Sequence, residues 1–216
     1  MGFFKYNQKK ALARTIYDHV KQTKKENFTY LNNEIVKKGQ TVFAGDSITE
    51  IYNITDYYAE YSKETGLAVY NRGISGDTSN RLLERLYDNV LSIEPKNIVY
   101  LIGTNDLGAG LTVDFVENNI KQILEQTKSK CPNAKIIVEG VYPVKNAGRR
   151  HNSDILELNK RIKNLCTDGI IYVDLTDVLK DENGKFNDKF TYDGLHPNAQ
   201  GFNEVTKVIL PLLLDN

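Results

Sequence analysis

Short apolar runs alternate with amphipathic stretches along most of the chain. Five runs have the length and the β-branched or apolar content of buried strands, at residues 41–44, 67–74, 97–103, 135–141 and 170–175. Between these runs, apolar side chains recur at helical spacing. Strands that alternate with helices predict a parallel sheet with right-handed crossovers and helices on both faces. The expected fold class is therefore α/β, a three-layer α/β/α sandwich with a five-stranded parallel sheet.

The first 40 residues are expected to add helices that pack on this main body. Their apolar positions fall into two helical sets, Leu12, Ile16 and Val20, and then Phe28, Leu31 and Ile35. Two helices are therefore predicted. No internal repeat or linker divides the chain, so residues 1–216 are expected to form one domain with residues 1–40 as an N-terminal helical extension.

Two further helical stretches bear on the position of a site. Tyr57, Tyr58 and Tyr61 cluster after the first strand, where they either cover the core or form a wall on which a substrate stacks. We expect the first of these. After the second strand, Asp77 or Thr78 is expected to cap the next helix.

Composition and charge give little reason to expect a charged or membrane partner. The chain has 28 basic and 28 acidic residues, hence no formal net charge, so nucleic-acid binding and stable membrane association are not expected. The longest strongly apolar run, 208–214, contains Pro211 and is too short to span a bilayer. No apolar segment follows the charged first ten residues, so no secretory signal is expected. The expected location is cytoplasmic. Cys131 and Cys166 lie far apart without C-x-x-C spacing and are expected to be free thiols.

Polar residues follow the predicted strands at the edge where parallel strands end together. They are G-D-S at 45–47, N-R-G at 71–73 and T-N-D at 104–106. A fourth set, D-G-L-H-P at 193–197, follows the fifth strand by a loop. Its Asp193 and His196 are three residues apart, so a bent loop can bring carboxylate and imidazole into contact.

These residues supply each part that a serine hydrolase needs. Ser47 would be the nucleophile, His196 the general base and then the general acid, and Asp193 the group that orients the imidazole. The donors to the oxyanion would be the backbone N–H groups of Ser47 and Gly73 and the side-chain amide of Asn105. No metal or organic cofactor is expected. Asp46, although it adjoins Ser47, is expected only to stabilise the turn.

The four sets, taken together, resemble the motif blocks of the SGNH, or GDSL-type, hydrolase family. In chain order they read G-D-S at 45–47, N-R-G-I-S-G-D-T at 71–78, G-T-N-D at 103–106 and D-G-L-H-P at 193–197. They cover most of the chain, and the departure is Ile48, where the family often has leucine. The resemblance implies a flavodoxin-like fold and ester hydrolysis.

By this resemblance, the four family-defining residues are Ser47, Gly73, Asn105 and His196, and Asp193 completes the triad. The family includes lipases, lysophospholipases, thioesterases and carbohydrate acetylesterases. The expected substrate is a small-molecule carboxylic ester, with short acyl groups such as acetyl on carbohydrates or other small alcohols, because no long insertion supplies an apolar lid. A lysophospholipase or thioesterase of the same family is the alternative. Whether the chain forms a homo-oligomer is left open.

Two functions of other classes are compatible with parts of the sequence. Asp46, Asp77 and Asp106 lie just beyond strand ends and could gather a divalent cation for phosphoryl chemistry. The second alternative is a catalytically inactive binding module of the same fold. The intact motif set argues against this alternative. Finally, the loop at 149–151, which contains His151, either borders the substrate cleft or is a solvated basic loop.

Overall fold

A five-stranded, fully parallel sheet forms the middle layer of the molecule. The computed structural model describes residues 2–215, with side chains for residue 12 and residues 15–215, so that Met1 and Asn216 of the expected domain lie outside the described residues. The strands are β1 (Thr41–Gly45), β2 (Val69–Gly73), β3 (Asn97–Leu101), β4 (Lys135–Glu139) and β5 (Ile171–Val173). Their order is β2-β1-β3-β4-β5. The predicted fold class is confirmed.

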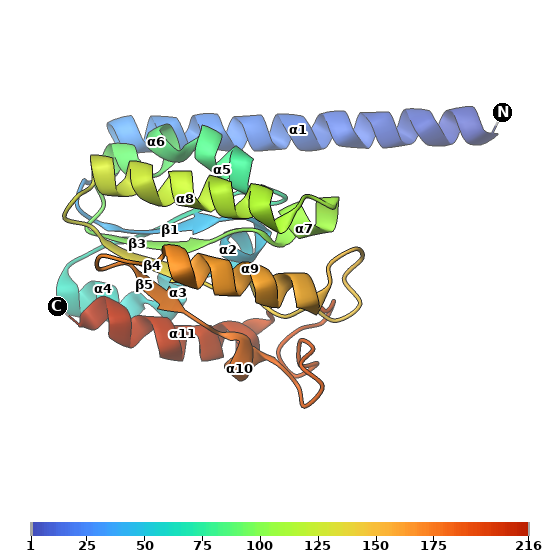
Figure 1. Ribbon diagram of the computed structural model, residues 1–216. Helices are drawn as coiled ribbons and strands as arrows, with labels where there is room; N and C mark the ends of the chain where they lie inside the picture. The colour runs from blue at the N-terminus through green and yellow to red at the C-terminus, as the bar shows by residue number, and fades with distance from the viewer. Residues whose placement is uncertain (1, 216) are drawn as a thin grey trace.

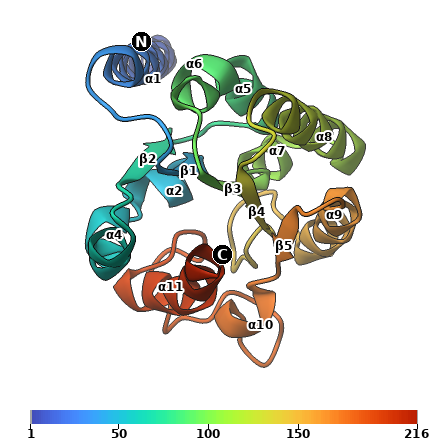
Figure 2. The ribbon, with the colours of Figure 1, turned by 90° about the vertical axis from the view of Figure 1, so that its left-hand side faces the viewer.

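Helices cover both faces of this sheet (Figures 1 and 2). One face carries α5 (Ser79–Glu84), α6 (Leu86–Asn89), α8 (Val113–Lys130) and α9 (Asn152–Leu165). The other carries α3 (Ile54–Tyr57), α4 (Ala59–Thr65), α10 (Thr176–Leu179) and α11 (Ala199–Leu214). Three short elements connect them, α2 (Ser47–Ile51), η1 (Leu91–Ile93) and α7 (Thr104–Ala109). Within residues 2–215, no helix has both the length and the apolar character needed to cross a bilayer.

The central strands are apolar at nearly every position because both of their faces are buried. On β1, Val42 and Ala44 belong to the core on one side of the sheet, and Phe43 belongs to the core on the other. On β3, Ile98 and Val99 divide in the same way. This explains why these strands appear in the sequence as short continuous apolar runs.

The tyrosine cluster after β1 belongs to the core. Tyr58 and Tyr61 are 0% and 2% exposed. Tyr57 is half-buried, and its hydroxyl donates to the carbonyl oxygen of Ala199, 2.7 Å away. The expectation that these rings cover the core is confirmed.

The N-terminal segment differs from its prediction. Residues 2–34 form one continuous helix, α1 (Gly2–Glu34), rather than two. Val20 and Phe28 are eight residues apart and lie on the same face of the helix, with Lys24 between them on that face. Nothing in this part of the sequence interrupts the helix. Phe28 is buried against the main body, but Leu12, Ile16 and Val20 are each more than half exposed. The N-terminal half of α1 thus projects beyond the rest of the molecule (Figure 1).

The cap of α5 also differs. Thr78 occupies the N-cap position without a side-chain cap bond, and Asp77 pairs with Arg85 instead. The carboxylate of Asp106, from the end of the next strand, accepts hydrogen bonds from the backbone N–H and the hydroxyl of Ser79. A carboxylate at the first turn of a helix satisfies free N–H groups and complements the helix dipole. A distant residue therefore performs the expected capping.

Candidate active site

Ser47 lies at the carboxyl end of β1, where the strand turns directly into α2. A Cβ atom on Gly45 would lie 2.2 Å from the carbonyl oxygen of Leu101, so only glycine allows β1 and β3 to approach so closely there. Asp46 then caps α2, because its side chain accepts a hydrogen bond from the N–H of Ile48 at 2.9 Å. The predicted turn-stabilising role of Asp46 is confirmed, and Ser47 is left at the first position of the helix.

Ser47, His196 and Asp193 form one hydrogen-bonded chain. Ser47 Oγ lies 2.9 Å from His196 Nε2, and His196 Nδ1 lies 2.6 Å from Asp193 Oδ2. An ionised carboxylate only accepts, so Nδ1 carries the proton and donates it to Asp193. Nε2 is then the acceptor for the hydroxyl of Ser47. The three predicted catalytic residues are thus brought together in the order that proton transfer from serine requires.

The turn at 193–196 pre-organises this arrangement. Asp193 Oδ1 accepts from the backbone N–H groups of Leu195 and His196, while Oδ2 accepts from the imidazole. Burial alone would raise the pKa of Asp193, but the side-chain and backbone hydrogen bonds of His196 and the N–H of Leu195 outweigh it and lower the pKa to about 2. Asp193 therefore stays ionised across the neutral range.

A pocket of about 600 Å³ opens in front of Ser47. Ser47, Asn105 and His196 line it, together with residues from several elements, which include Tyr17, Ile51, Ser75, Gly76, Tyr192, Leu195 and Pro197. Tyr17 belongs to α1, which the sequence offered no reason to place at the site. Tyr192, at the rim, is 93% exposed, so that side of the pocket is open.

The side-chain amide of Asn105 has a defined orientation. Arg150 Nη2 donates to Asn105 Oδ1 at 3.0 Å, and Asn105 Nδ2 donates to the carbonyl oxygen of Asp77 at 3.0 Å. Arginine has only donors and a carbonyl only accepts, so the amide cannot be reversed. The NH₂ group is therefore held on the side of the 74–78 segment. Arg150 comes from the loop after β4, so this loop does reach the site, whereas His151 is exposed.

The two glycines of the second motif block, Gly73 and Gly76, have different surroundings in the structure. The N–H of Gly73 donates to Asn71 Oδ1 at 2.9 Å, and Gly73 is not among the described residues that line the pocket. A Cβ there would lie 2.3 Å from the backbone nitrogen of Glu50, so packing against α2 accounts for glycine at this position. Gly76 lines the pocket instead, with a φ of +70° that favours glycine. The motif block alone does not single out Gly76.

The three aspartates considered as metal ligands have separate partners. Asp46 caps α2, Asp77 pairs with Arg85 at 2.7 Å, and Asp106 accepts from Ser79. Burial, followed by the nearby charges of Asp77 and Asp106, raises the pKa of Asp46 to about 7, although the N–H of Ile48 opposes the shift. Among residues 2–215, no group of three histidine, cysteine or acidic side chains is arranged to hold a metal ion.

Comparison with known proteins gives a consistent picture. The model of the GDSL-like lipase/acylhydrolase family matches residues 43–203. Platelet-activating factor acetylhydrolase IB subunit alpha1 from Bos taurus is 28% identical over 185 residues, which cover 82% of this chain and 76% of that protein. A Streptococcus pneumonia protein provisionally described as a platelet activating factor has a similar structure, with a TM-score of 0.88 and 25% identity, covering 96% of this chain and 99% of that one.

One relative has an additional part. N-acylneuraminate cytidylyltransferase from Escherichia coli is 28% identical over 208 residues, which cover 92% of this chain but 48% of that protein. The chain thus spans about half the length of this relative. The cytidylyltransferase activity in that name is therefore not assigned to this chain.

Proposed function

Because the chain belongs to the GDSL-like lipase/acylhydrolase family, we propose that it is a serine hydrolase that cleaves carboxylic esters through an acyl-serine intermediate. The observation that carries the proposal is the hydrogen-bonded chain from Ser47 through His196 to Asp193, all of which line an open pocket. No metal or cofactor takes part in the proposed reaction.

In the first half of the reaction, Ser47 Oγ attacks the ester carbonyl and its proton passes to His196 Nε2. Asp193 stabilises the imidazolium that forms. The oxyanion accepts hydrogen bonds from the N–H groups of Ser47 and Gly76 and from Asn105 Nδ2, with Gly76 in the place predicted for Gly73. His196 then protonates the departing alcohol, and a water molecule repeats the sequence to release the acid.

We further propose that the enzyme prefers short acyl groups, above all acetyl, on carbohydrates or other small alcohols. Two observations support this: the bovine relative is named an acetylhydrolase, and Tyr192, which lines the pocket, is 93% exposed, so the pocket is open on that side. A cytoplasmic location belongs to the same proposal, supported by the free thiols of Cys131 and Cys166.

The test compares hydrolysis of p-nitrophenyl acetate with the butyrate and octanoate esters, and then a panel of acetylated sugars, lysophospholipids and acyl thioesters. We expect the acetate ester to be hydrolysed fastest and Ser47→Ala to abolish turnover with the thermal midpoint unchanged. Full activity in Ser47→Ala would falsify the proposed mechanism. Faster turnover of octanoate, a lysophospholipid or a thioester would instead assign the chain to the alternative substrate classes.

A further inference from the structure

The pocket-lining segment at residues 74–78, here called the 74–78 loop, is contacted by α1. The Tyr17 hydroxyl donates to the carbonyl oxygen of Ser75 at 2.7 Å. Lys21 Nζ lies 3.6 Å from Asp77 Oδ1. Tyr17 and Lys21 are one turn apart and so lie on the same face of α1.

A third residue on this face reaches the loop indirectly. Lys24 Nζ lies 2.7 Å from Glu50 Oε1, and the other oxygen of Glu50 accepts from the backbone N–H of Ser75. The carbonyl oxygen of Ser75 thus accepts from α1 itself, through Tyr17. Its N–H donates to Glu50, which Lys24 of α1 contacts. These two bonds fix the peptide groups on either side of the Ser75 Cα atom, so the backbone of the 74–78 loop is held from this side.

The ion pair between Lys21 and Asp77 is almost completely buried. Their side chains are 8% and 0% exposed. The ammonium group makes no hydrogen bond within the described part of the chain, and it lies 4.9 Å from the centre of the Tyr17 ring. A buried pair of this kind adds little net stability, because desolvation offsets the attraction. The main effect of this ion pair is therefore to fix the position of Asp77.

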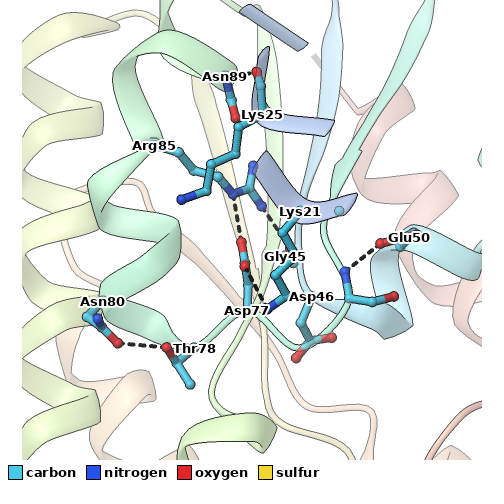
Figure 3. Close-up of polar contacts among 12 residues, drawn as sticks. Lys21, Lys25, Gly45, Asp46, Glu50, Asp77, Thr78, Asn80, Arg85 and Asn89 are labelled. Atoms are coloured by element: carbon cyan, nitrogen blue, oxygen red, sulfur yellow. Dashed lines mark hydrogen bonds and ion pairs between the residues drawn. The ribbon is translucent and has the colours of Figure 1, made fainter. Parts of the chain in front are cut away.

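Asp77 lies between Lys21 of α1 and Arg85 (Figure 3). Its carbonyl oxygen accepts from Asn105 Nδ2, and its carboxylate accepts from Arg85 Nε at 2.7 Å. Arg85 Nη2 in turn donates to the carbonyl oxygen of Gly45 at 3.0 Å, two residues before the nucleophile. Asp77 is thus fixed by Lys21 on one side and Arg85 on the other, and it holds the Asn105 amide directly.

The fit between α1 and the loop depends on glycine at position 76. A Cβ atom there would lie 2.2 Å from the Tyr17 hydroxyl oxygen and 3.1 Å from Lys21 Nζ. The residues that make this contact lie outside the family match at residues 43–203. The contact therefore joins a helix outside the family match to a loop inside it.

We propose that Tyr17 and Lys21 are positioning residues that hold the 74–78 loop, and through it the Gly76 and Asn105 donors, in the geometry that the oxyanion requires. The proposal rests on the proposed function above. It makes α1 a part of the active site, because a helix outside the family match then supports the oxyanion hole.

The test uses the full chain with Lys21→Met, Tyr17→Phe and the charge-preserving Lys21→Arg. Gln22→Ala is the control, because Gln22 is an exposed neighbour on the same helix. We measure kcat and KM for p-nitrophenyl acetate, the thermal midpoint, and the inhibition constant of phenylboronic acid. The boronic acid forms a tetrahedral adduct on a catalytic serine and so reports on the oxyanion hole.

Lys21→Met is expected to lower kcat about 10- to 100-fold with KM unchanged, less than the loss of a whole donor. The inhibition constant should rise in parallel, and the thermal midpoint should change little, because Asp77 keeps its buried pair with Arg85 when the ammonium is removed. Tyr17→Phe should have a smaller effect in the same direction, and Lys21→Arg should retain more of kcat than Lys21→Met.

Unchanged kcat and boronate inhibition in both Lys21→Met and Tyr17→Phe would overturn the proposal. A loss of kcat together with a lower thermal midpoint would also overturn it if the inhibition constant of the boronic acid stayed at the wild-type value. That pattern indicates a structural role alone. If wild-type protein hydrolyses no ester, or Ser47→Ala is fully active, the proposed function fails first and this inference fails with it.

Discussion

Two aspartates near the nucleophile show how the environment decides the role of a residue. Asp193, hydrogen-bonded to His196 and to two backbone N–H groups, has its pKa lowered to about 2. Asp46 adjoins Ser47 in the sequence, but burial beside other carboxylates raises its pKa to about 7. Only an ionised carboxylate can stabilise an imidazolium strongly. The aspartate that is distant in the sequence is therefore the better catalytic partner.

Matched substitutions test this distinction. Asp193→Asn should lower kcat by about 10² to 10⁴, because the amide cannot stabilise the charged imidazole and favours the wrong tautomer. Asp46→Asn should keep most of the activity, since asparagine also caps a helix well and adds no charge. Both are measured as kcat with p-nitrophenyl acetate. An Asp46→Asn enzyme as impaired as Asp193→Asn would show that catalysis depends on the Asp46 carboxylate, whose Oδ2 accepts from Asn105 Nδ2 at 3.4 Å.

At the scale of elements, α9 holds the loop that brings Arg150 to the site. Asn159 accepts from the N–H of Val141 and donates to its carbonyl oxygen, and Asn152 does the same with Val144. These side chains replace the strand partners that the backbone loses after β4. The loop is thereby fixed at two points before it reaches Arg150.

Arg150→Met is expected to lower kcat about tenfold to a hundredfold, because the Asn105 amide loses the donor that fixes its orientation. KM should change little, since Arg150 is not among the pocket-lining residues of the described chain. Arg149→Met is the control, because Arg149 is exposed in the same loop. Equal losses in the two variants would mean that the loop's charge, rather than the bond to Asn105, is responsible.

How far these elements could be predicted depends on the range of the interactions that form them. The central strands β1, β3 and β4 were predictable because burial on both faces leaves a local apolar run. The pair of Asp193 and His196 was predictable because its members lie within one turn. The contact of Tyr17 with Ser75 joins residues 58 positions apart, and that of Arg150 with Asn105 joins residues 45 apart. Such contacts leave no local pattern in the sequence.

At the scale of the whole molecule, one buried acid links stability to pH without taking part in the proposed reaction. Glu139, at the end of β4, is 3% exposed and accepts a hydrogen bond from the Tyr142 hydroxyl. Burial raises its pKa from 4.5 to about 7, although the Tyr142 bond opposes the shift. The folded state therefore binds a proton at Glu139 that the unfolded chain has already released between these two pH values.

The free energy of unfolding should consequently fall as pH rises from about 4.5 to above 7, because the folded state binds more protons there. The contribution of Glu139 is on the order of 3 kcal/mol, since each pKa unit is worth about 1.4 kcal/mol. Glu139→Gln removes this contribution while leaving an acceptor for Tyr142. Urea unfolding of both proteins across this range should show a difference that grows in favour of Glu139→Gln as pH rises. The exposed Glu182→Gln control should show no such trend. A constant difference between Glu139→Gln and wild type at all pH values would mean that Glu139 is already ionised in the fold, with its burial cost offset by Tyr142.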